Sequence, residues 1–255
     1  MVSTTARIDQ SAYIAVVTEV IGRLTASQTE NVRAAAEVVA DALAAGSVVQ
    51  AFGTGHSSAL AMEIAGRAGG LVPTNMLSLR DGIIFGGDAP ADLDPFVERD
   101  PAIAHRIYEL APVEPGDPFV IASNSGANGS TVEMALLARS RGHAVIAFTS
   151  LAHSREMASR HPSGKRLFEV ADVVIDNCAP FGDAALSLPD AGTVCAVSSV
   201  TAAIAAQMMT ADVVGLLLAR GVEPPVYLSS NIPGGDEHNQ RLEARYAGRI
   251  RRVAA

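Results

Sequence analysis

The stretch FVIASNSGANGSTVEMALLARSRGHAVIAFTS, residues 119 to 150, decides the fold. It begins with the apolar run Phe119–Ala122, passes through a loop of serine, asparagine and glycine, and continues into a helical pattern over Thr131–Arg141. A second apolar run, Ala144–Thr149, follows directly. A strand, a polar turn, a helix and another strand in this order form a βαβ unit, in which the two strands are parallel.

The alternation continues on both sides of this unit. Further apolar runs that predict strands lie at Val48–Phe52, Gly70–Met76 and Val173–Asp176, and further helical patterns lie at Ser58–Ala68 and Val194–Ala219. Helices that alternate with strands cover both faces of a parallel sheet. The sequence therefore predicts a doubly wound α/β fold, with five parallel strands in flavodoxin-like order.

The segment Leu79–Asp117 interrupts this alternation and is rich in proline, aspartate and glycine. Its apolar residues and a short helical pattern at Ile103–Leu110 predict an ordered excursion, long enough to serve as a lid or an interface. No internal repeat and no linker divides the chain. Residues 1–255 are therefore predicted to form a single domain.

Two helices are predicted before the first strand. Apolar residues recur at helical spacing over Tyr13–Leu24 and over Val32–Leu43. Ser27, with Glu30 three positions later, has the pattern of a capping box, which predicts Ser27 as the N-cap of the second helix. Residues 1–46 thus form a helical extension, for which we expect another subunit as the packing partner.

Charge and composition exclude one large class of function. The 255 residues are 49% hydrophobic and 18% charged, enough to bury a substantial core, and the formal net charge is −8 at pH 7. This charge disfavours a nucleic-acid-binding protein, because phosphate backbones are held by clusters of lysine and arginine. The one basic cluster, RLEARYAGRIRR at 241–252, is expected to be a solvated helix end.

Neither a membrane span nor a disulfide is predicted. The apolar run Thr193–Gly221 contains Gln207 and Asp212, and an ionised aspartate at a bilayer centre costs a few kcal/mol, so a buried core helix is expected instead. The first residues lack the pattern of a secretory signal. Cys178 and Cys195 have no CxxC spacing, so that the reducing cytoplasm is the expected location.

Two polar turns follow predicted strands. FGTGHSS at 52–58 joins a strand to a helix, and the loop that begins at Ser123 does the same. In open parallel sheets, ligands bind at the carboxyl ends of the strands, where backbone N–H groups point toward them. One such turn is equally well explained by capping serines, whereas two on neighbouring strands favour a shared phosphate cradle. Neither turn matches the dinucleotide or the P-loop fingerprint.

These motifs resemble a known family. PGDPFVIASNSGANGSTVEMALLARSRGHAVIAFTS at 115–150 resembles the signature of the sugar isomerase (SIS) domain, and FGTGHSS resembles the first phosphate turn of that family. The resemblance extends over roughly Val32–Ala219. It implies the SIS fold, a sugar phosphate as ligand, and assembly as a homodimer or homotetramer. The whole chain is most similar to a stand-alone bacterial branch, related to phosphoheptose isomerase and N-acetylmuramic acid 6-phosphate etherase.

The resemblance also implies which residues hold the phosphate. They are Ser57, Ser123, Asn124, Ser125, Asn128 and Ser130. Asn128 and Ser130 depart from the threonine that often occupies this turn of the family.

Candidate acids and bases lie close to these turns. Removal of a proton next to a sugar carbonyl requires a positioned base and an acid. Glu63 lies about two turns into the helix after the first turn, where it either points into the pocket or pairs with Arg67 at i+4. His56 stands inside the first turn, where it faces the expected ligand as an acid or a sugar-binding group. Glu133 lies early in the helix predicted over Thr131–Arg141, where the helix dipole favours a carboxylate, so that capping explains this residue as well as catalysis does.

Residues 222–255 are predicted to form an active-site loop and helix. In several members of the resembled family, a histidine from near the C-terminus or from a partner subunit completes the site. This implies His238, with Glu237 beside it, whereas a solvated loop is the alternative. The loop Cys178–Leu186 is expected to cover the pocket, with Asp183 as a further candidate. No histidine spacing is typical of a metal site, and no cofactor is indicated.

Three functions remain open. A lyase or dehydratase would abstract the C2 proton of an N-acetylhexosamine 6-phosphate and eliminate the C3 substituent. An aldose–ketose isomerase would share that proton abstraction and return the proton to C1. A sensor would bind the sugar phosphate without turnover, although no helix-turn-helix or basic arm accompanies the domain. Four amide side chains, those of Asn124, Asn128, Asn231 and Asn239, suit an N-acetyl group and favour elimination.

Overall fold

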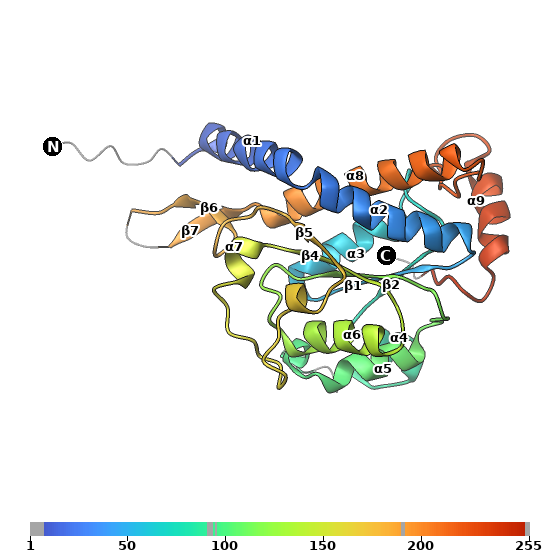
Figure 1. Cartoon of the computed structure of the whole chain (residues 1–255), viewed down its shortest axis with the longest axis horizontal. Coiled ribbons are helices and arrows are strands. Elements are labelled where there is room, and N and C mark those ends of the chain that lie inside the picture. Colours follow the sequence, from blue (N-terminus) through green and yellow to red (C-terminus); the bar gives the residue numbers. More distant parts are fainter. Residues whose placement is uncertain (1–7, 91–93, 95, 190–191, 253–255) are drawn as a thin grey trace.

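The computed structural model describes residues 8–90, 94, 96–189 and 192–252, and consists of a central sheet between two layers of helices (Figure 1). The strands are β1 Val49–Gly53, β2 Thr74–Leu77, β3 Phe119–Ala122, β4 Val145–Thr149, β5 Val173–Asp176, β6 Ala184–Ser187 and β7 Thr193–Ala196. The α-helices are α1 Gln10–Ser27, α2 Thr29–Ala44, α3 Ser58–Ile64, α4 Asp81–Gly86, α5 Ala102–Leu110, α6 Gly129–Ser140, α7 Leu151–Ser154, α8 Ser198–Ala219 and α9 Gly235–Glu243.

The main sheet has the order β2-β1-β3-β4-β5, and every neighbouring pair is parallel. This is the flavodoxin-like order, so that the predicted fold class is confirmed. Strand order reverses between β1 and β3, which places the loops after these two strands next to each other at the carboxyl edge. The predicted FGTGHSS turn and the loop after Ala122 are those two loops.

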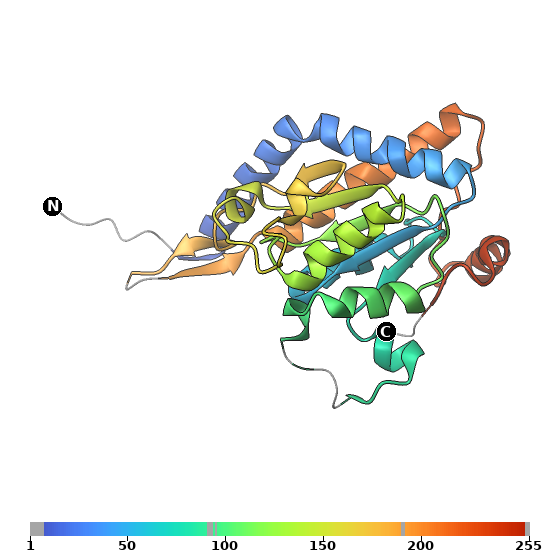
Figure 2. The same ribbon diagram turned by 60° about the horizontal axis from the view of Figure 1, so that its bottom comes forward.

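Alternate residues of each strand enter different cores. On one face, Ala51 of β1 and Phe148 of β4 pack with α2, α3 and α8. On the other face, Phe52 and Ala147 pack with α5 and α6. Figure 2 shows α5 and α6 on the side of the sheet that faces away from α2 and α8. The near-continuous burial of the strands follows from this double covering.

Several predicted boundaries are wrong for local reasons. The strand predicted from Gly70 begins only at Thr74, because residues 70–72 pair with 225–227 instead. The helix predicted to Ala68 ends at Ile64, ahead of Gly66 at φ +78°. The helix predicted from Val194 begins at Ser198, since Thr193–Ala196 pairs with β6 in an antiparallel ribbon.

The junction of the first two helices also differs from the prediction. Ser27 is the last residue of α1 and its Oγ donates to the carbonyl of Arg23, whereas Gln28 occupies the N-cap position of α2. The side chain of Gln28 accepts from the backbone N–H of Asp176 instead of capping the helix. Within the chain α2 packs against α8 and β5, whereas the packing of the N-terminal helices on another subunit stays a prediction.

The basic cluster near the C-terminus is not a solvated helix end. Arg249 forms an ion pair with the fully buried Asp117, and Arg252 donates to the backbone carbonyls of Val72 and Thr74. These contacts fasten the last described residues along the amino ends of β1 and β2. Arg249 and Arg252 of the cluster therefore serve the fold.

The apolar helix α8 is buried along one face only. By length and composition alone this helix is apolar enough to cross a membrane. Its apolar stretch of 18 residues has a mean hydropathy of 1.7, and 33% of that stretch is buried. Ala205, Met209 and Val213 enter the core below α2, as expected of a core helix in a globular protein. Val200 and Leu218, in contrast, are 39% and 61% exposed.

Candidate functional site

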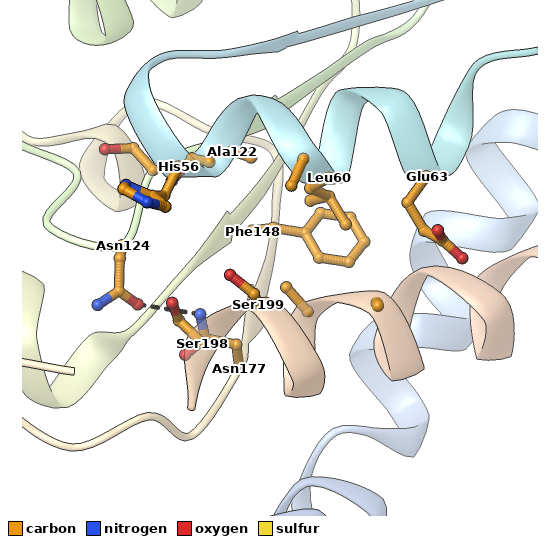
Figure 3. Close-up of a pocket in the computed structure, with 14 residues that line it drawn as sticks. His56, Leu60, Glu63, Ala122, Asn124, Phe148, Asn177, Ser198 and Ser199 are labelled. Carbon is orange, nitrogen blue, oxygen red and sulfur yellow. Dashed lines mark hydrogen bonds between the residues drawn. The ribbon is translucent and has the colours of Figure 1, made fainter. Parts of the chain in front are cut away.

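A cavity of about 240 Å³ opens at the carboxyl edge of the sheet, between α3 and the first turns of α8 (Figure 3). Its lining residues are His56, Ser57, Ala59, Leu60, Glu63, Ala122, Ser123, Asn124, Phe148, Asn177, Ser198, Ser199, Ala202 and Ala203. The cavity therefore lies where the strand order reverses, which is the usual ligand site of this architecture.

The first polar turn brings His56 and Ser57 to the cavity. Both belong to a short 3-10 helix, Gly55–Ser57, that connects β1 to α3. The turn is so tight that a Cβ at Gly53 would lie 2.4 Å from the carbonyl oxygen of Ser57. Only glycine permits this close approach, and it sets the hydroxyl of Ser57 at the cavity wall.

The second polar turn contributes Ser123 and Asn124. Ser123 is buried, and its Oγ accepts from the backbone N–H of Gly126 at 3.1 Å, which leaves its hydroxyl proton for a ligand. The Oδ1 of Asn124 accepts from Nδ2 of Asn177 at 3.0 Å, so that the amide N–H groups of Asn124 face outward as donors. The two predicted turns thus converge on one cavity.

The cavity is also lined by Asn177, Ser198 and Ser199, none of which belongs to the two polar turns recognised in the sequence. Asn177 follows β5 directly, so that the rule applied to the other strands, polar residues at carboxyl ends, could have found it. Ser198 and Ser199 open α8, and the error in the predicted start of that helix hid them.

Glu63 lies on α3 in the wall of the same cavity, with 20% of its side chain exposed. Its Oε1 accepts from Nε2 of Gln207 on α8 at 2.6 Å and from Nη1 of Arg67. Both alternatives considered for Glu63 therefore hold, since it faces the pocket and also pairs with Arg67. Among the residues that the structure describes, no hydrogen bond to Oε2 is found, and this oxygen is the one available to a ligand.

The structure does not bring Ser125, Asn128 or Ser130 to the cavity wall. Oδ1 of Asn128 accepts from Arg160 at 3.0 Å, and Oγ of Ser130 donates to the carbonyl of Glu98 at 2.7 Å. The short 3-10 helix Val97–Arg99 covers the start of α6, and this contact occupies the polar groups there. Val97–Arg99, which belongs to the segment Leu79–Asp117, thus covers the second polar turn on the side away from the cavity.

Glu237 and His238 lie far from the cavity within one chain. Both belong to α9, which Figure 1 shows at the end of α8 opposite to the β6–β7 ribbon. A ring nitrogen of His238 lies 3.0 Å from the carbonyl of Val226, and the other faces Arg241. Asn231 and Asn239 line a separate hollow of about 470 Å³ beside α9. Of the four amides that suggested an N-acetyl group, only Asn124 reaches the cavity.

Glu133 has a structural partner on each side. Its two carboxylate oxygens lie 2.7 Å from Nε2 of His105 and 2.6 Å from Nε2 of His161. Although burial raises the pKa of Glu133, the hydrogen bonds from the two imidazoles hold it below its usual range. Glu133 therefore links α6 to α5 and to the loop after α7, outside the cavity. Within the described part of the chain, no three or more His, Cys, Asp or Glu side chains are arranged so that they could hold a metal ion.

Comparison with known proteins places this geometry in a family. A family model described as the SIS domain matches residues 12–150. The UPF0309 protein of Listeria monocytogenes is 39% identical over 236 residues, which cover 91% of this chain and 94% of that protein. The UPF0309 protein of Streptomyces griseus is 40% identical over 230 residues, with coverages of 89% and 91%.

Solved structures agree on the fold. Phosphoheptose isomerase from Neisseria gonorrhoeae superposes with a TM-score of 0.54 at 17% identity, covering 80% of this chain and 96% of that one. A phosphosugar isomerase homologue from Bacteroides fragilis gives a TM-score of 0.53 at 13% identity, with coverages of 80% and 88%. At these identities the likeness is one of fold. The sequence matches and the two converging turns together establish that the chain belongs to the SIS domain family of phosphosugar-binding proteins, within its UPF0309 group.

Proposed function

We propose that this protein is a dehydratase of N-acetylhexosamine 6-phosphates, which removes the C2 proton and eliminates the C3 hydroxyl. The observation that carries the proposal is the position of Glu63, whose carboxylate shares one cavity with the hydroxyl and amide donors of both polar turns. Membership of the SIS family supports a sugar phosphate as the ligand.

The phosphate is held by hydroxyl and amide groups. No lysine or arginine is among the residues that line the cavity. Ser57, Ser123 and the amide of Asn124 supply donors from two adjacent loops, and His56 adds the one lining side chain that can carry positive charge. Such a set suits a single phosphate group on a small ligand, in keeping with the modest volume of the cavity.

Glu63 acts as the base. Because Gln207 and Arg67 both bond to Oε1, they orient the carboxylate and leave Oε2 for the proton at C2. The open-chain aldehyde at C1 makes that proton removable. Oε2 takes the proton, and the electron pair of the C2–H bond forms an enolate. Collapse of the enolate restores the aldehyde, forms the C2=C3 double bond and expels the C3 oxygen, which leaves as water after it accepts a proton from an acid.

His56 is the acid in this scheme. It lies in the first turn at the cavity, and its imidazole ring can both donate and accept a hydrogen bond. The expected product is a 2-acetamido-2,3-unsaturated aldose 6-phosphate together with one water molecule. No cofactor is needed, because the reaction transfers protons only.

The apolar wall of the cavity favours an N-acetylated sugar. Leu60, Phe148 and Ala202 lie between the polar end and Glu63, as Figure 3 shows for Leu60 and Phe148. The methyl group of an acetamido substituent would bury apolar surface there, whereas a sugar with only hydroxyl groups would leave this wall without a partner.

The working form is a homo-oligomer in which a second copy covers the exposed face of α8. Val200, Ala211 and Leu218 are exposed apolar residues at helical spacing along this face, next to Gln207, and an apolar helix face is normally covered. The face borders the cavity through Ser199 and Ala203. We assign Glu237 and His238 to this shared site, as groups that a second copy supplies. The two free thiols described, Cys178 and Cys195, suit a reducing cytoplasm.

A proton NMR time course in deuterated buffer tests the reaction. With N-acetylglucosamine 6-phosphate, we expect the H3 signal of the sugar to be replaced by a new vinylic signal, and Glu63→Gln to abolish the change. Interconversion of an aldose and a ketose with deuterium incorporation would instead establish an isomerase, for which glucosamine, fructose and sedoheptulose 6-phosphates are the comparison substrates. Unchanged spectra together with a thermal shift on ligand addition would establish a sensor.

A further inference from the structure

A carboxylate of the same chain accepts hydrogen bonds from the N-terminal end of α8. Asp183 lies just before β6, and its Oδ1 accepts from the backbone N–H groups of Ser198 at 2.7 Å and Val197 at 3.2 Å. Its Oδ2 accepts from Oγ of Ser198, also at 2.7 Å. Ser198 lines the cavity, facing the side of Asn124 in Figure 3. Asp183 is thus connected to the cavity by its hydrogen bond with Ser198.

These hydrogen bonds fix the polarity of Ser198. An ionised carboxylate accepts hydrogen bonds and cannot donate them, so that the hydroxyl proton of Ser198 is committed to Asp183. The remaining lone pairs of Oγ can only accept. A ligand group that meets Ser198 must therefore be a donor, such as a sugar hydroxyl or the N–H of an acetamido group.

The same carboxylate makes the start of α8 unsuitable for a phosphate. A helix of 22 residues would otherwise present unpaired N–H groups and a partial positive charge at the cavity. Asp183 already accepts from two of these N–H groups and brings a negative charge of its own. The dianion of a phosphate monoester has no proton to give to Ser198, so that both the hydrogen bonding and the charge direct the phosphate of a sugar phosphate to the opposite wall.

We propose that Asp183 is a positioning residue that sets the orientation of the sugar phosphate in the cavity. Acting through Ser198, it selects a hydroxyl or acetamido N–H at the α8 wall and excludes the phosphate from it, which leaves the phosphate to Ser57, Ser123 and Asn124. This inference rests on the proposed function for the identity of the ligand, whereas the exclusion of phosphate from α8 does not.

The backbone holds Asp183 in place for this role. Its φ is +69°, directly after Gly182 at φ +77°, and its carbonyl accepts from the N–H of Val197 at 3.1 Å. Asp183 therefore joins the open end of the β6–β7 ribbon, where β6 begins and β7 ends, to the start of α8. Asparagine, like aspartate, tolerates this left-handed conformation better than most residues do, which makes Asp183→Asn a variant with the same shape and no charge.

Titration calorimetry of two ligands with three variants tests the proposal. The ligands are N-acetylglucosamine 6-phosphate and inorganic phosphate, and the variants are Asp183→Asn, Ser198→Ala and the double variant. For Asp183→Asn we expect sugar phosphate affinity to fall about tenfold and inorganic phosphate affinity to rise severalfold, because a hydrogen bond is lost and a repulsive charge is removed. Ser198→Ala should lower only the sugar phosphate affinity.

The double variant separates positioning from a general structural effect. If Asp183 acts through Ser198, the double variant loses no more sugar phosphate affinity than the single variant with the larger loss. Additive losses, or an inorganic phosphate affinity that does not rise in Asp183→Asn, would overturn the proposal. Failure of the proposed function has a different signature, in which the unaltered protein binds no sugar phosphate. In that case the rise in inorganic phosphate affinity still decides whether Asp183 excludes phosphate.

Discussion

Gln207 on α8 and Glu63 on α3 are joined by a hydrogen bond at the cavity wall, with Nε2 of Gln207 2.6 Å from Oε1 of Glu63. The bond connects the two helices that enclose the cavity. It fixes the carboxylate without using Oε2. Since α8 also carries Ser198, one helix sets the positions of the proposed base and of the hydroxyl proposed to bind the sugar.

Loss of this orientation should slow the reaction more than it weakens binding. In Gln207→Leu, Arg67 alone holds the carboxylate of Glu63, and we expect kcat to fall about tenfold with KM changed less than twofold. Steady-state kinetics measure both constants. A rise in KM at unchanged kcat would show that Gln207 contacts the substrate rather than the base.

Removal of the base itself should have a larger effect. Glu63→Gln retains the shape and one hydrogen-bonding oxygen, so that sugar phosphate affinity should persist while kcat falls by roughly 10³-fold, as is typical of a lost general base. Glu133→Gln is the matched control, because it makes the same change on α6 outside the cavity. Equal losses of activity in the two variants would contradict the role assigned to Glu63.

The buried Asp117 should contribute strongly to stability. Nη2 of Arg249 lies 2.8 Å from Oδ1 and 2.9 Å from Oδ2 of Asp117. The carboxylate also accepts from the backbone N–H of Val48 and from the side chain of Gln50. Arg249→Met leaves this buried charge without its cation, which should lower the free energy of unfolding by about 3 kcal/mol.

Urea denaturation of three variants tests this ion pair. The matched variant Asp117→Asn removes the charge instead, and the double variant should lose less stability than the sum of the two single losses. Strict additivity would mean that the ion pair contributes little beyond the separate contacts of each residue.

Asp81 predicts a dependence of stability on pH. Asp81 is 2% exposed, and burial raises the pKa of its carboxyl group from 3.8 to about 6, against the opposing effects of a hydrogen bond from the backbone of Ser78 and the charge of Arg251. Because the pKa is higher in the folded state, the contribution of Asp81 to stability is complete below pH 3.8 and is lost as the pH rises through about 6.

Asp81→Asn removes this titration. We expect it to raise the free energy of unfolding near pH 7.5 by up to about 3 kcal/mol relative to the unaltered chain, and to leave it nearly unchanged below pH 4. Denaturation midpoints measured across this range provide the comparison. A stabilisation that is equal at both ends of the range would show that ionisation of Asp81 is not its source.

The exposed face of α8 predicts an oligomer that a charge can disrupt. Val200→Glu places a carboxylate on the proposed contact face and should shift the protein toward a monomer in sedimentation velocity runs, with loss of activity if a second copy completes the site. Phe96→Glu is the control, since Phe96 is 59% exposed but lies on the segment that covers α6. A protein that sediments as a monomer before any substitution would exclude the shared site.

Local pattern was sufficient to predict the framework of the protein. The apolar runs and helical repeats predicted every strand of the main sheet, and the two polar turns marked its ligand edge, because these signals depend on residues close together in the chain. The same reasoning misplaced the starts of β2 and α8. The first error arises from pairing with the distant residues 225–227, and the second from pairing with Ala184–Ser187 in a local hairpin.

The sequence by itself determined the parallel sheet, the two converging turns and the presence of Glu63 beside them, since spacing along one strand or helix fixes these relations. Only the tertiary structure decided which polar groups remain for a ligand. It joined Asn177 to Asn124, Asp183 to Ser198 and Gln207 to Glu63, and it turned Asn128 and Ser130 toward other partners. The reason is physical: a polar side chain forms whichever hydrogen bonds its folded surroundings offer, and those partners come from segments far away in the chain.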